Sequence, residues 1–287
     1  MNFLAVMLAL AVERAFPQGT ALGESRLLAG LLGRLRGLLR IADGPALSWL
    51  LVALAIAITL AADAIVQGAL LDILFSAAVL FFCLGPRDLS DDVQRLIAAR
   101  TQGNSEDAER LSRVLQSGPD PDENHRSLIG ALFIQSHERL FGVLLWFIAL
   151  GPAAAVGYRV ASRLPRLLEE LGYGSGARLA AEQLHGLAAW LPARLTAALF
   201  ALAGSMDDAL AAWRRLGELN YLGAWRSHSW AVLAEVGAGA LAMEEDDGAV
   251  TVAPDLSTAL REVLRMQTRA LLILLAGFAV YTSGSLV

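Results

Sequence analysis

Long uncharged runs alternate with segments rich in Arg, Asp and Glu along this chain of 287 residues. The central run is residues 140–159, LFGVLLWFIALGPAAAVGYR, whose first nineteen positions carry no charge. Nineteen residues rise about 28 Å as a helix, roughly the thickness of a bilayer's hydrocarbon core. An interior Gly-Pro pair is tolerated in membrane helices because neighbouring groups re-satisfy the freed backbone. We therefore predict a membrane helix that is broken at Gly151-Pro152.

Other apolar stretches are further candidates for the membrane. The N-terminal part, residues 1–87, begins with an uncharged dozen that predicts a short or tilted helix, and residues 44–86 predict a hairpin of two spans. The central membrane part, residues 140–206, contains the broken helix, and residues 270–287 form an uncharged C-terminal run. The pattern predicts an all-α fold: a polytopic helical membrane protein with about 4–6 membrane-embedded helices.

Residues 25–41 predict an amphipathic helix, because their leucines share one helical face. The opposite face carries arginines, so we expect the helix to lie in the membrane surface and bind anionic head groups. A helix packed on the protein's own polar domain is the alternative. The arginines expected to face the lipid are Arg26, Arg34, Arg36 and Arg40.

Residues 88–139 and 207–269 predict two water-facing helical segments. Both are rich in arginine, and the positive-inside rule places them on the cytoplasmic side of a bacterial inner membrane. Residues 159–186 are also arginine-rich, which conflicts with a single full crossing by residues 140–159. A helix that dips and returns at its break, or an external loop whose acids offset its arginines, would resolve the conflict.

The composition agrees with a membrane protein and excludes one class of partner. The chain is 56% apolar and 18% charged, its mean hydropathy is +0.52, and its net charge is -5. Because the net charge is negative, we expect no nucleic-acid binding. The acidic loop at residues 119–125 could hold magnesium, but a solvated turn is the simpler expectation. The pattern indicates no particular cofactor.

Four charged residues stand at the edges of apolar runs and predict one polar site at the cytoplasmic edge of the membrane. An arginine within an apolar stretch costs roughly 3 kcal/mol on insertion scales unless it is paired or snorkels to the interface. The break at Gly151-Pro152 could fold both ends of the central run toward one side. The candidate site residues are Asp88, Glu138, Arg159 and Arg194, with the arginines as clamps for anionic groups and a carboxylate as base or magnesium ligand.

The chain resembles the AmpE family over nearly its whole length. The resemblance is carried by Glu13-Arg14, by GPRDL from Gly85, by the run HERLFGVLLWFIALGPAAAVGYR from His137, by WLPARLTAAL from Trp190 and by residues 204–213. It implies an inner-membrane regulatory or sensory modulator linked to peptidoglycan recycling, β-lactamase induction and hence antibiotic resistance. A muropeptide-like or phosphate-bearing ligand, or a partner protein, is then expected.

The sequence is similar, more distantly, to the CobD/CbiB cobalamin-biosynthesis membrane proteins. Arg87-Asp88, Glu138, Tyr158-Arg159 and the segment Pro192–Leu195 look like counterparts, whereas the early His-Pro motif of those enzymes is missing. This similarity implies a second reading, a membrane enzyme that forms an amide bond on a carboxylate substrate. A transporter is a third possibility, although no inverted repeat is detectable. The sequence alone does not decide whether the protein is an enzyme.

Overall fold

The computed structural model describes residues 2–15, 30, 44–84, 89–116, 128–218, 225–241 and 256–284, and these ranges contain helices and turns without a strand. The all-α prediction is confirmed. Among the described residues, five segments are long and apolar enough to cross a membrane, within the predicted range: Pro45–Ile65, the stretch that begins at Ala69, Leu128–Leu150, Ser175–Ala203 and Leu256–Ser283. The chain divides into two compact units, Met1–Arg87 with Gly142–Ala189, and Asp88–Phe141 with Trp190–Val287.

Unit 1 is a group of helices around α9. It contains α1 (Asn2–Ala15), α3 (Pro45–Ile65), α4 (Ala69–Leu84), α8 (Gly142–Leu150), α9 (Pro152–Glu170) and the first part of α10 (Ser175–Ala203). The predicted hairpin corresponds to α3 and α4, which a short link joins at Gly68 with φ +106°. Helix α3 packs on α9, while α4 packs on α1, α8 and α9. The other faces of α3 and α4 expose large apolar side chains, as lipid-facing helices do.

The break in the central helix is confirmed at the predicted place. Helix α8 ends at Leu150, Gly151 adopts φ +83°, and Pro152 starts α9 at the position where a missing N–H is harmless. The apolar helix before the break is longer than the sequence suggested. It begins with α7 (Leu128–Ser136) and continues through a π-helical turn, η2 (His137–Phe141), into α8. The charged residues expected at its entrance therefore lie in its middle.

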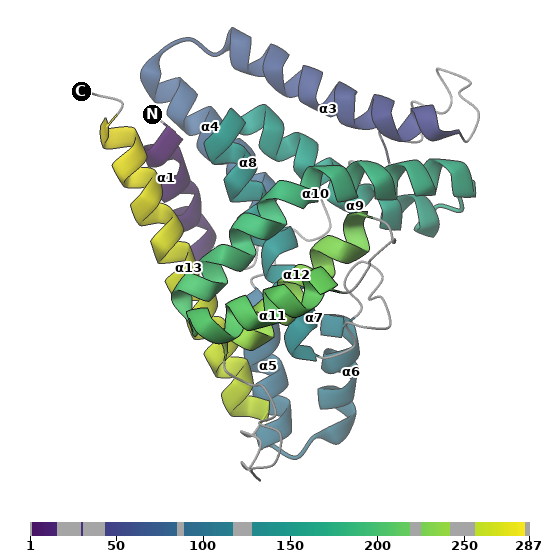
Figure 1. Cartoon of the computed structure of the whole chain (residues 1–287). Coiled ribbons are helices and arrows are strands. Elements are labelled where there is room, and N and C mark those ends of the chain that lie inside the picture. Colours follow the sequence, from purple (N-terminus) through teal and green to yellow (C-terminus); the bar gives the residue numbers. More distant parts are fainter. Residues whose placement is uncertain are drawn as a thin grey trace. The chain divides into compact units, whose positions relative to one another are not determined.

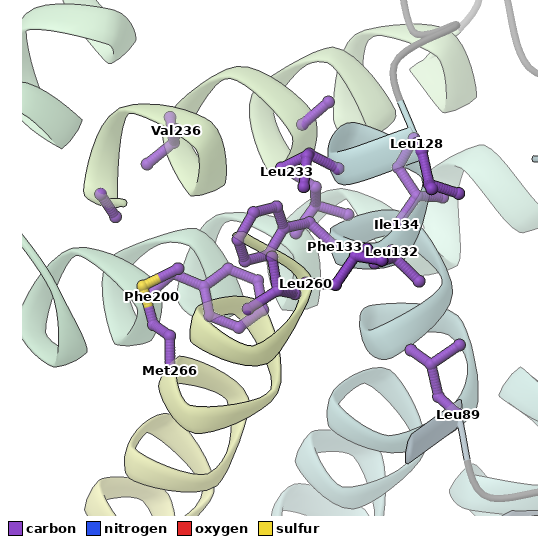
Figure 2. Close-up of a cluster of buried hydrophobic side chains, with 14 of the residues drawn as sticks. Leu89, Leu128, Leu132, Phe133, Ile134, Phe200, Leu233, Val236, Leu260 and Met266 are labelled. Atoms are coloured by element: carbon purple, nitrogen blue, oxygen red, sulfur yellow. The ribbon is translucent and has the colours of Figure 1, made fainter. Parts of the chain in front are cut away.

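Unit 2 surrounds one hydrophobic core (Figure 2). Besides α7 and η2, the described part of the unit contains six elements, all labelled in Figure 1: α5 (Leu89–Thr101), α6 (Ser105–Gln116), the last part of α10, α11 (Met206–Glu218), α12 (Trp225–Ala240) and α13 (Leu256–Gly284). At the centre of the core, the rings of Phe133 and Phe200 lie 4.9 Å apart. Gly237 lets α12 approach Phe133 closely, because an added Cβ would lie 2.5 Å from that ring. Helix α12 is thereby fixed against α7.

Each unit contains one joint that fixes part of α10 or the turn after it. Pro192 lies inside α10 and cannot donate to the carbonyl of Ala188, and Trp146 Nε1 donates to that oxygen instead, at 3.0 Å. In unit 2, the turn between α10 and α11 is tied to the end of α12, because Ser205 N donates to Ala240 O at 2.7 Å. A Cβ on the neighbouring Gly204 would collide with the same oxygen. Glycine is required there by close packing.

The predicted surface helix at residues 25–41 lies outside the described residues except for Gly30, and so does the acidic loop at residues 119–125. Their predicted roles in lipid and magnesium binding remain predictions. The predicted boundary between water-facing and membrane segments at residues 269 and 270 falls within α13, which runs without interruption from Leu256 to Gly284.

Candidate functional site

The candidate site is built on the π-helical turn η2, which carries three consecutive charged or titratable residues. His137 is fully buried, Glu138 is 6% exposed, and Arg139 lies 3.5 Å from the carboxylate of the buried Asp92 on α5. A π-turn widens the helix by one residue and occurs frequently at functional sites. Here the π-turn carries three neighbouring polar side chains in the middle of an otherwise apolar helix. Burial of such groups is costly unless they are paired.

Glu138 belongs to a buried cluster with two residues of α12. Its Oε1 accepts a hydrogen bond from Trp230 Nε1 at 3.1 Å, and Trp230 is 1% exposed. The guanidinium of Arg226, itself 6% exposed, lies 4.5 Å from the centroid of the Trp230 ring. Arg226 and Trp230 stand four residues apart and so share one helical face. We call Glu138, Arg226 and Trp230 the buried cluster.

His137 is held in one orientation by Thr196 of α10. The Thr196 hydroxyl donates its single proton to Pro192 O at 2.8 Å, and it lies 2.9 Å from His137 Nδ1. Because that proton is already used, Thr196 accepts from His137, and Nδ1 therefore carries the ring proton. In the neutral imidazole, Nε2 is then the basic nitrogen.

Arg194 has a different environment from the one we expected. Its Nη1 donates to Trp190 O at 2.8 Å, and its guanidinium carbon lies 4.1 Å from the centroid of the Trp190 ring. Within the part of the chain that the structure describes, no carboxylate forms an ion pair with Arg194. Burial lowers the pKa of the neighbouring His228, and the positive charge of Arg194 lowers it further. These contacts favour the alternative in which Arg194 reaches the membrane interface.

Of the other two predicted site residues, the structure describes one. Arg159 lies on α9 in unit 1 and is 4% exposed, beside Tyr158, which is 2% exposed. Asp88 lies outside the described residues. Glu138 and Arg194 both belong to unit 2 but share no direct contact that would join them in one site. The convergence of all four residues on one site stays a prediction.

Sequence reasoning missed three residues of this region: Arg226, Trp230 and Thr196. Arg226 lies in a segment with many arginines, so its type alone gave no signal. The spacing Arg226-x-x-x-Trp230 was the available sign, since it places a guanidinium over an aromatic ring on one helical face. Thr196 lies two residues after the predicted site residue Arg194, on another face of α10. Among the described side chains, no three of His, Cys, Asp or Glu gather as a metal-binding group.

The chemistry of the buried cluster suits a ligand with both acidic and donor groups. A guanidinium can bind a carboxylate or phosphate in a two-pronged contact, whereas a carboxylate accepts from N–H or O–H groups. Titratable groups of opposite charge thus lie on facing helices in a low-dielectric setting, where their interactions with a ligand are strong.

Comparisons with known proteins agree with the sequence resemblance. Residues 1–287 match the family described as "Regulatory signalling modulator protein AmpE". A relative named "Cobalamin biosynthesis protein CobD" from Chromobacterium violaceum is 30% identical over 199 residues, 67% of this chain and 61% of the relative. A relative of the same name from Stutzerimonas stutzeri is 26% identical over 174 residues, 57% of this chain and 54% of the relative. The matches thus span less than two thirds of those relatives. No solved structure matches significantly.

Proposed function

The chain belongs to the AmpE family, and from this premise we propose that it is an inner-membrane modulator of signalling in peptidoglycan recycling and β-lactamase induction. The family description supports a regulatory role, and the candidate spans make the chain a multi-pass membrane protein. The ligand of the proposal is muropeptide-like or phosphate-bearing. Such a molecule presents acidic groups together with amide or hydroxyl donors.

The buried cluster is the observation that carries this proposal. Glu138 accepts from the ring N–H of Trp230, Arg226 lies over the face of the same ring, and both charged residues are more than nine-tenths buried. Removing charges from water costs several kcal/mol for each ion, so an apolar packing would serve stability equally well or better. Groups retained at that cost are candidates for function. In the proposed complex, Arg226 binds the acidic group of the ligand and Glu138 accepts its N–H or O–H.

Induction of β-lactamase in a strain without its own copy of this protein tests the proposal. The wild-type chain should restore induction, and Glu138→Gln should not, because an amide keeps the size of the side chain but not its charge. Glu235→Gln is the matched control, since Glu235 is an exposed residue of the same α12. Both variants are compared at equal amounts of protein in the membrane. Normal induction with Glu138→Gln would remove the buried cluster from the mechanism.

Localisation in the inner membrane, with the water-facing helices α6 and α11 on the cytoplasmic side, is part of the same proposal. Single cysteines at the exposed positions Arg110 and Arg214, in a background with Cys83→Ala, should resist a membrane-impermeant maleimide added to intact cells. They should react after the cells are opened. Labelling of either position in intact cells would contradict the proposed orientation.

A second candidate function is favoured by the relatives named for cobalamin biosynthesis. In this reading the chain is a membrane enzyme that forms an amide bond on a carboxylate substrate. Glu138 or Asp88 would serve as base or hold magnesium. Expression in a bacterium that lacks its CobD protein separates the two readings. Growth without added cobalamin would support the enzyme, and failure to grow with normal protein levels would support the modulator.

A further inference from the structure

An exposed aromatic surface lies at the junction of α10 and α12, outside the buried cluster. Trp190 is 41% exposed and Trp225 is 57% exposed, and their ring centroids lie 6.4 Å apart. Leu191 and Leu195, which follow Trp190 along α10, are also exposed, at 54% and 45%. All four residues belong to unit 2. Together with Arg194 we call them the tryptophan platform.

Arg194 uses one N–H donor within the described residues, and its other donors can bind a ligand. A guanidinium has five N–H donors, and here one bond is made, from Nη1 to Trp190 O at 2.8 Å. The guanidinium carbon lies over the Trp190 ring, at 4.1 Å from its centroid. Such a cation–π contact holds the guanidinium at the ring while its other N–H groups can bind an anion. As noted above, the described carboxylates do not fill that role.

We propose that the tryptophan platform binds the phosphate of a phospholipid head group at the edge of the membrane. The phosphate is an anionic group of the kind that the sequence leads us to expect Arg194 to bind. The indole rings suit this depth, because tryptophans with one apolar face and one N–H concentrate at the membrane–water interface. Two-pronged binding by a planar guanidinium matches the oxygens of a phosphate.

The surrounding residues identify the lipid as the occupant. Helix α10 is a candidate membrane span, so the exposed leucines on it are expected to meet hydrocarbon. A soluble saccharide could also stack on two tryptophans, but it would leave Leu191 and Leu195 in water. Arg269 on α13 illustrates the contrasting case, because its guanidinium is occupied by Ala203 O at 3.2 Å and by Glu262 at 3.7 Å.

Native mass spectrometry of the full chain in detergent tests the lipid assignment. The wild-type chain should retain phosphatidylglycerol, and Arg194→Gln should weaken that binding about tenfold, the loss expected for one charge-assisted contact. Diacylglycerol, which has no phosphate, should bind the two proteins equally. Arg113→Gln is the matched control, since it removes the same charge from an exposed position on α6. Equal phosphatidylglycerol binding by wild type and Arg194→Gln would overturn the proposal.

Competition distinguishes the sources of the anion and the classes of occupant. Millimolar inorganic phosphate should not displace the lipid, and neither should a soluble muropeptide. Displacement by either one would replace the lipid with a soluble ligand as the natural occupant. Glu138→Gln should keep its phosphatidylglycerol, so a failure of the buried cluster and a failure of the platform give different results.

A depth measurement in lipid nanodiscs provides a second, independent check. A nitroxide on Leu195→Cys, in a background with Cys83→Ala, should report a depth in the hydrocarbon just below the lipid phosphates, from its accessibility to oxygen and to a water-soluble nickel complex. The same label on Leu272→Cys, an exposed position of the apolar half of α13, provides a comparison deeper in the hydrocarbon. A label at position 195 that reads as fully aqueous, or as deep as position 272, would contradict the proposal.

Discussion

Gly204→Ala tests the joint between the α10–α11 turn and α12. The new Cβ would lie 3.0 Å from the carbonyl carbon of Ala240 and 2.9 Å from the sulfur of Met266, and it would collide with the Ala240 oxygen. The Met266 side chain can rotate away. The Ala240 carbonyl cannot, because it is backbone and also accepts from Ser205 N at 2.7 Å. The turn and the end of α12 must therefore separate.

The expected loss of stability follows from two effects. Inserting a methyl group into a packed joint costs about 1–3 kcal/mol. Stretching or breaking the Ser205–Ala240 hydrogen bond costs about 0.5–1.5 kcal/mol more. The reduced freedom of alanine in the unfolded chain returns roughly 0.4–1 kcal/mol. We therefore expect a net decrease of about 2 kcal/mol in the free energy of unfolding.

Unfolding of the full chain by SDS in mixed micelles measures this change. Gly217→Ala is the matched control, because a Cβ there would meet nothing within 4 Å and the residue lies inside α11. An alanine in an exposed helix should raise the free energy of unfolding by about 0.5 kcal/mol. The two substitutions should thus have opposite signs. Equal or greater stability of Gly204→Ala, with the control behaving as expected, would show that the joint is not close-packed.

Two further predictions concern the proline joint and pH. Trp146→Phe should destabilise the chain by about 1–2 kcal/mol, because it leaves the Ala188 carbonyl without a donor. In a Pro192→Ala background, residue 192 regains an N–H for that carbonyl, so the same substitution should cost clearly less. Equal losses in both backgrounds would contradict this assignment. Stability should fall as pH drops below about 6.5, because the unfolded chain binds a proton at His228 while the folded chain, with its lowered pKa, resists it. His228→Gln should make the slope of stability against pH shallower in denaturant titrations, and an unchanged slope would count against this role.

Local patterns predicted the parts of the fold that local physics determines. The all-α architecture follows from long apolar runs, and the break at Gly151-Pro152 follows from a residue that reaches positive φ beside one that lacks an N–H. The beginning of the central helix did not follow, because the triplet His137–Arg139 looks like a helix end in sequence. A π-turn accommodates those charges in mid-helix, and hydrophobic periodicity gives no sign of it.

The candidate site was predictable only where a residue is unusual for its own surroundings. Glu138 stood out as a carboxylate beside a long apolar run, and the structure finds it buried. Its partner Trp230 lies 92 positions away, so the pair depends on how α12 packs against the central helix. Arg194 stood out for the same local reason, yet its contacts are with Trp190, four residues earlier on its own helix. Sequence indicated which groups need a partner, whereas tertiary packing selects the partner.

Helix α13 behaves mechanically as a stiff rod. Its 29 residues extend about 43 Å, without a proline and with no glycine before Gly277. The first half packs on α5 and α7, the helix that leads into η2, whereas the second half exposes Leu272, Val280 and Tyr281. Since the rod has no hinge, a tilt of about 10° of its packed half would move its far end by roughly 4 Å relative to its midpoint. Small displacements of its packed half would therefore be enlarged at its far end.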